Sequence, residues 1–89
     1  MTGERVRVEV RLHALLAELA GTRRHRVEVP RRLTIQGLLE ALSSELPGLS
    51  RISEYRINII AVRDGEPLPK EFEVGEGDVI DLLPPSSGG

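Results

Sequence analysis

The stretch from Arg5 to Leu12 constrains the fold most, because charged and aliphatic side chains alternate strictly along it. The aliphatic residues are Val6, Val8, Val10 and Leu12. A period of two with β-branched residues on one side predicts a strand with one buried face. A shorter alternation from His25 to Val29 predicts a second such strand, which ends at Pro30. Both strands need an apolar layer to cover that face.

One segment has the pattern of such a layer. Thr34 is a typical N-cap residue, and aliphatic residues follow it at steps of three and four: Ile35, Leu38, Leu39, Leu42 and Leu46. This stripe predicts an amphipathic helix lying on a sheet and ending at Pro47-Gly48. A shorter segment, Ala14 to Ala20, predicts one or two helical turns with Gly21 as the C-cap.

Further strands are predicted in the second half of the chain. The run from Ile57 to Val62 is apolar on both alternate faces, so it is either covered twice or presents one face to a partner. Asp64-Gly65 predicts a hairpin turn. Phe72 and Val74 predict a short strand or an irregular crossing of the sheet.

The last predicted strand runs from Val79 to Leu83. Ile80 and Leu82 share one face, and Leu83, on the other face, is a candidate exposed apolar residue. The whole order predicts an α+β fold, with a mixed four- to five-stranded sheet, one main helix and a short helix. With 89 residues and no cysteine, the chain fits one domain whose core depends on aliphatic packing.

The last six residues differ from the rest: Pro84, Pro85, Ser86, Ser87, Gly88 and Gly89. Proline favours an extended path, so the Pro-Pro pair predicts a segment held away from the domain. Six extended residues reach about 20 Å, which is enough to enter the cleft of a partner. We therefore expect a folded domain over residues 1–83 and an extended, flexible C-terminal tail over residues 84–89.

Charge and composition exclude several classes of partner. The net charge is −2 and Tyr55 and Phe72 are the only aromatic residues, which argues against a nucleic-acid partner. We expect solvated loop charges at a basic cluster formed by Arg23, Arg24, Arg26, Arg31 and Arg32. Solvated turn charges are likewise expected at Glu73, Glu76, Asp78 and Asp81. No apolar run approaches the roughly 20 residues of a membrane span, and we expect a cytoplasmic protein with no membrane partner.

Side-chain patterns for catalysis are missing. The two histidines, His13 and His25, lack the spacing of a metal site, and Gly75 and Gly77 are too few for a phosphate-binding loop. We expect no metal site and no cofactor bound by the chain itself. The terminal carboxylate of Gly89 remains as the reactive group. Since a carboxylate is inert until another enzyme activates it, the chain alone is expected to be non-catalytic.

The chain resembles the small subunit of molybdopterin synthase, a sulfur carrier of the ubiquitin-like β-grasp family. The resemblance rests on the strand-helix-Gly opening, the helix after Thr34, the strand Ile60-Ala61-Val62, and the ending Gly77-Asp78-x-Ile80 to Gly88-Gly89. It implies that an adenylyltransferase of the ubiquitin-activating type uses ATP-Mg to form a Gly89 acyl-adenylate. Sulfide then replaces AMP and leaves a thiocarboxylate. The large synthase subunit would take this sulfur for cyclic pyranopterin monophosphate in molybdenum cofactor biosynthesis.

The resemblance also implies roles for particular residues. Gly88 allows a narrow approach, the two prolines hold the tail extended, and Leu83, Ile60 and His13 form the partner interface. Pairing with the large subunit implies a heterotetramer. The chain departs from the family at Arg63, where an Asn is usual, and at Ser86-Ser87 between the prolines and glycines, so the sulfur acceptor stays open.

Three alternatives follow from the same tail. The chain could be a sulfur carrier for thiamine synthesis or tRNA thiolation, or a protein modifier conjugated through Gly89. Lys70 is its only lysine, so modifier chains could grow only there or at the N-terminus. In the third alternative the domain is a non-covalent β-grasp interaction module and its Gly-Gly is incidental.

Overall fold

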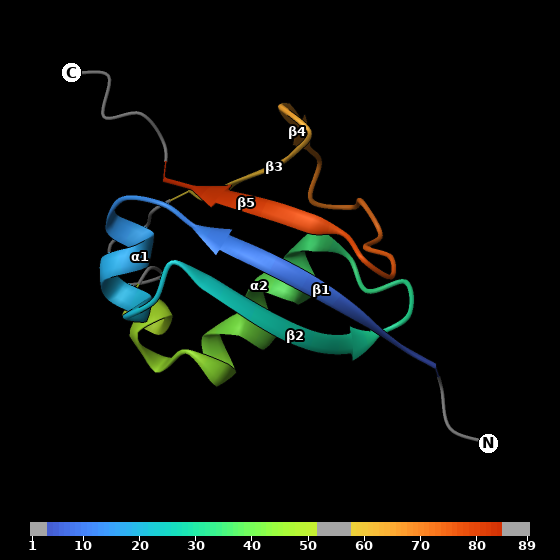
Figure 1. Ribbon diagram of the computed structural model, residues 1–89, viewed down its shortest axis with the longest axis horizontal. Helices are drawn as coiled ribbons and strands as arrows, with labels where there is room; N and C mark the ends of the chain where they lie inside the picture. The colour runs from blue at the N-terminus through green and yellow to red at the C-terminus, as the bar shows by residue number, and fades with distance from the viewer. Residues whose placement is uncertain (1–3, 52–57, 85–89) are drawn as a thin grey trace.

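The computed structural model describes residues 4–51 and 58–84 (Figure 1). Five strands form one sheet in the order β2-β1-β5-β3-β4. β1 is parallel to β5, and the other neighbouring strands are antiparallel. The strands are β1 Arg5–Leu12, β2 Arg24–Pro30, β3 Ile60–Arg63, β4 Glu66–Leu68 and β5 Val79–Leu83; the helices are α1 Leu15–Ala20, α2 Ile35–Glu45 and the 3-10 helix η1 Pro47–Ser50. The predicted mixed sheet with one main and one short helix is confirmed.

The one-sided strands pair as their alternation requires. β1 and β2 pair along their full length, with Val8 opposite Val27 and Glu9 opposite Arg26. The aliphatic residues of both strands are buried, whereas the arginines between them are exposed. Polar and apolar side chains therefore separate onto an outer and an inner face of the sheet.

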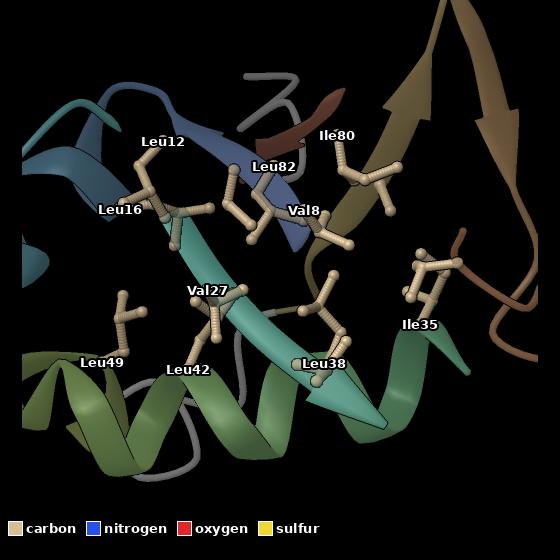
Figure 2. Close-up of a cluster of buried hydrophobic side chains, with 14 of the residues drawn as sticks. Val8, Leu12, Leu16, Val27, Ile35, Leu38, Leu42, Leu49, Ile80 and Leu82 are labelled. Atoms are coloured by element: carbon tan, nitrogen blue, oxygen red, sulfur yellow. The ribbon is translucent and has the colours of Figure 1, made fainter. Parts of the chain in front are cut away.

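Helix α2 covers the inner face, behind the sheet in Figure 1. Its N-terminus is capped as predicted, since the Oγ1 of Thr34 accepts a hydrogen bond from the backbone N–H of Gly37 at 3.2 Å. Leu38 and Leu42 are completely buried and point toward the side chains of the sheet (Figure 2). No buried polar residue occurs among the described residues, so aliphatic packing alone forms the described core.

Two short helices close one end of the core. The left-handed Gly21 ends α1 as predicted, with a φ of 78° and its N–H bonded to the carbonyl of Ala17. Gly48 in η1 approaches the backbone of α1 so closely that a Cβ on it would lie 1.7 Å from the carbonyl oxygen of Leu19. Only a glycine fits at this contact.

The second half of the chain follows the predicted order of elements, except that its short strand, β4, lies before Phe72 and Val74. Asp64 and Gly65 both have positive φ and form the predicted turn, and β4 begins directly after it. Phe72 and Val74 lie in irregular chain joined to Thr34 by an isolated bridge at Glu73, so the irregular crossing is confirmed and the strand interpretation is wrong.

The predicted strand from residue 57 also differs from the structure. Ile57 lies outside the described residues, and β3 begins only at Ile60. The side chain of Ile60 is 40% exposed, so β3 is covered on one face only, and the interpretation of double coverage is wrong.

Candidate functional site

The site begins where β5 ends. β5 lies in the middle of the sheet between β1 and β3, and Pro84 follows its last residue, Leu83. The predicted boundary between domain and tail therefore falls at the end of a central strand. The other predicted tail residues, Pro85, Ser86, Ser87, Gly88 and Gly89, lie outside the described residues.

Apolar side chains gather on the outer face beside this exit. Leu83 pairs with Ile60, and Val62 follows two residues later on the same side of β3. Ala61 and Leu82, the alternate residues of these strands, are buried against the helices. We call Ile60, Val62 and Leu83 the outer apolar patch.

The degree of exposure within the outer apolar patch differs from the prediction. Leu83, expected to be exposed, is half-buried, because it lies between neighbours on β1 and β3. Ile60, at the beginning of β3, is the exposed member. Val62 is half-buried and was missed by the sequence analysis, although its spacing of two residues from Ile60 would have indicated it.

His13 lies at the same end of the sheet. Its backbone N–H donates to the carbonyl oxygen of Leu82 at 3.2 Å, which continues the β1-β5 pairing by one residue. Its Nε2 lies 2.9 Å from Oδ1 of Asp81, an outer-face residue of β5. The structure therefore brings together the three predicted interface residues, His13, Ile60 and Leu83, and adds Asp81 as a partner of the histidine.

A strained turn fixes the position of His13. Ala14, the next residue, has a φ of 54° and a ψ of −128°, a conformation that favours glycine. The N–H groups of Leu16 and Ala17 hold the turn by donating to the carbonyls of His13 and Ala14. Such strain costs about 1–3 kcal/mol and commonly occurs at functional sites.

Glu76, Asp78 and Asp81, expected to be solvated turn charges, make side-chain bonds instead. The carboxylate of Asp78 accepts from the backbone N–H of Gly75 at 2.8 Å and from Nη1 of Arg63 at 3.2 Å. Glu76 accepts from the backbone N–H of Arg7 at 2.9 Å. These carboxylates hold the turn before β5 in place, because Asp78 accepts from a backbone N–H within the turn and Glu76 accepts from a backbone N–H of β1.

Arg63, one of the departures from the family, has a structural role here. Its guanidinium carbon lies 4.5 Å from the centroid of the Phe72 ring while its Nη1 donates to Asp78. This cation-π contact joins the end of β3 to the irregular chain before β5.

The predicted basic loop is also corrected. Arg24 and Arg26 belong to β2, with Arg23 before the strand and Arg31 and Arg32 after it. Arg24 and Arg26 lie on the outer face because the buried residues of β2, Val27 and Val29, occupy the alternate positions.

The described residues contain no group of three His, Asp or Glu side chains able to hold a metal ion. His13 and His25 lie apart, and His25 instead bonds Oε1 of Glu45 at 2.8 Å. Within residues 4–51 and 58–84 no helix is both long and apolar enough to cross a membrane.

The family model and the similar proteins place the chain in the same family. The model of the ThiS family matches residues 10–89. Small archaeal modifier protein 1 of Haloferax volcanii is 38% identical over 87 residues, which cover 92% of this chain and all of that protein. The molybdopterin synthase sulfur carrier subunit of Drosophila melanogaster is 38% identical over 90 residues, covering 98% of this chain and 96% of the relative.

The fold agrees with this match. The crystal structure of the Haloferax volcanii modifier superposes with a TM-score of 0.77 at 32% identity, covering 93% of this chain and 99% of the other. The sheet order and the two helices are those expected of a ubiquitin-like β-grasp domain. The chain therefore belongs to the ThiS family and has the β-grasp fold.

Proposed function

We propose that this protein is a sulfur carrier whose terminal Gly89 is converted to a thiocarboxylate and donates its sulfur in molybdopterin synthesis. The observation that carries the proposal is the position of the outer apolar patch at the root of the tail. A partner that binds Ile60 and Leu83 is already beside Pro84, from which an extended tail reaches about 20 Å.

The family match supports the same assignment. It extends through Gly88 and Gly89, and one relative of 38% identity is named a molybdopterin synthase sulfur carrier subunit. We infer two partners that take the tail in turn, an adenylyltransferase of the ubiquitin-activating type and the large subunit of molybdopterin synthase. Both would use the outer apolar patch, so their binding would be mutually exclusive. By family resemblance, the complex with the large subunit would be a heterotetramer.

The chemistry begins in the active site of the adenylyltransferase. The Gly89 carboxylate attacks the α-phosphate of ATP-Mg, pyrophosphate leaves, and an acyl-adenylate forms. A thiol reduces a persulfide donor, forming a disulfide and releasing sulfide; the sulfide then attacks the acyl carbon, and AMP leaves with the electron pair of the broken acyl-phosphate bond. Both steps would take place in the active site of the adenylyltransferase, in the cytoplasm. The carrier therefore supplies a reachable carboxylate and a docking surface rather than catalytic side chains.

A second function is favoured by one relative. Small archaeal modifier protein 1, also 38% identical, is named as a protein modifier. Activation of Gly89 would be the same, but a lysine amine of a target would displace AMP and form an amide. Carriers for thiamine synthesis or tRNA thiolation differ again only in the acceptor of the sulfur.

Mass spectrometry distinguishes these outcomes. After incubation with ATP-Mg, the cognate adenylyltransferase and a sulfur donor, the C-terminal peptide should gain about 16 Da as sulfur replaces oxygen. A variant lacking Gly89 is the matched control and should gain nothing. No mass change in the wild-type protein would contradict the carrier function. A ladder of conjugates that needs Gly89 in cells would favour the modifier instead.

A further inference from the structure

The outer face of the sheet is divided into a basic and an apolar half. The apolar half is the patch on β3 and β5, and the basic half lies on β1 and β2. We call the basic half the arginine face; its side chains come from Arg5, Arg7, Glu9, Arg11, Arg24, Arg26 and Glu28. Five arginines and two glutamates give this face a net charge of +3, although the whole chain carries −2.

The arginine face has too few carboxylates to neutralise its guanidinium groups. Glu9 is shared by three of them, with its oxygens 3.4 Å from Nε of Arg11, 3.5 Å from Nε of Arg24 and 3.8 Å from Nε of Arg26. Glu9 is mostly buried beneath them, whereas the Arg26 side chain is 82% exposed. One carboxylate cannot neutralise three cations, so the surplus positive charge faces solvent.

The remaining arginines are held in place across the same face. Arg5 donates from Nη2 to the backbone carbonyl of Glu28 at 3.0 Å, and Nε of Arg7 lies 3.5 Å from Glu76. Holding guanidinium groups in a fixed array lowers the entropy lost when they bind carboxylates. The arginine face is therefore prepared for an anionic surface.

The arginine face is continuous with the proposed docking site. Arg11 is the β1 neighbour of Asp81, which lies two residues from Leu83 and bonds His13. A partner that covers the outer apolar patch therefore meets the arginines of β1 one strand spacing from β5, about 5 Å, and those of β2 two spacings away, about 10 Å.

We propose that the arginine face binds an acidic surface on a protein partner that takes up the tail, and that it speeds their encounter. The inference rests on the proposed function, because the partner is the adenylyltransferase or the large synthase subunit. Glu28 favours a protein over a nucleic acid, since its exposed carboxylate would repel a continuous run of phosphates. Phe72, the aromatic residue within the described ranges, lies beneath Arg63 and away from this face.

The test compares two variants with the same change in net charge. R24Q/R26Q removes two charges from the arginine face, and K70E removes the same amount elsewhere. Lys70 lies by the N-terminus of α2, where its carbonyl accepts from the N–H of Gln36. Stopped-flow association is measured with the purified adenylyltransferase and, separately, with the large subunit, in about 50 mM and about 500 mM salt.

We expect R24Q/R26Q to lower the association rate with at least one partner about tenfold in low salt. The difference should vanish in high salt, and K70E should differ from wild type less than twofold. Association of R24Q/R26Q at the wild-type rate with both partners would overturn the inference, as would an equal loss in K70E. Loss of tRNA binding, with both protein association rates unchanged, would also overturn it and assign the arginine face to RNA.

The result separates the two proposals. If wild type gains the thiocarboxylate mass and R24Q/R26Q associates normally, the sulfur carrier function stands and the role of the arginine face fails. If wild-type protein binds neither partner and gains no mass, both fail.

Discussion

The contact between Gly48 and α1 gives a prediction that can be worked out from distances. In the G48A variant the new Cβ would lie 1.7 Å from the carbonyl oxygen of Leu19 and 2.8 Å from its carbonyl carbon. Real Cβ atoms essentially never approach closer than 3.0 Å, so η1 and α1 must separate by about 1.3 Å. Both atoms belong to backbone, and no side chain can rotate to relieve the clash.

The separation would loosen one end of the core. Leu16 of α1 is completely buried and Leu49 of η1 is 3% exposed. A gap of about 0.5–1 Å already removes a quarter to a half of the dispersion energy of each contact. Overpacking costs about 1–3 kcal/mol, and a clash between two backbone segments belongs at the upper end, so we expect a loss of about 3 kcal/mol. For a domain of this size that lowers Tm by about 12–24 °C.

Urea and thermal unfolding measure this change. G75A is the matched control, because Gly75 also has an ordinary φ and the nearest atom to its Cβ would be Oδ2 of Asp78 at 3.9 Å. We expect G75A to stay within about 0.5 kcal/mol of wild type or to be slightly more stable. If G48A also unfolds within about 0.5 kcal/mol of wild type, the proposed steric cause is wrong.

Three further substitutions test the cap, the turn before β5 and the outer apolar patch. T34A should lower the free energy of unfolding in urea by about 1 kcal/mol because the Gly37 N–H loses its acceptor, whereas T34S should retain most of it. D78A should cost about 1.5–3 kcal/mol in the same assay, since Gly75 and Arg63 lose their acceptor; a loss below about 0.5 kcal/mol would contradict this. I60D should slow thiocarboxylate formation more than tenfold in a mass-spectrometric time course while secondary structure by circular dichroism is kept. An unchanged rate would exclude Ile60 from docking.

Local patterns account for most of the fold. β1 matches its prediction residue for residue, because four aliphatic residues at a period of two leave only one way to bury them. Thr34 and Gly21 were predicted correctly because capping depends on a few neighbouring residues. β4 was missed, since three residues with Pro67 at their centre contain neither a period nor strand-forming side chains.

The contacts around the site could not be predicted in the same way. His13 bonds Asp81 and Arg7 bonds Glu76 only because β1 pairs with β5, strands separated by most of the chain. Sequence spacing contains no information about that register until the sheet order is known. The expected partner interface at Ile60, Leu83 and His13 came instead from the family resemblance. The structure pairs Ile60 with Leu83 and bonds the N–H of His13 to Leu82, and the interface itself stays a prediction.

The central position of β5 also has a mechanical consequence. Its backbone is bonded to β1 on one side and to β3 on the other, and Pro84 continues the chain from its end. A pull on the tail therefore loads two ladders in shear at once, whereas a pull on an edge strand would peel one ladder a bond at a time. An energy-driven unfoldase that pulls on the tail would therefore act on a strand held by a ladder on each side. Such resistance would keep the domain folded while its C-terminal end passes from one partner to the next.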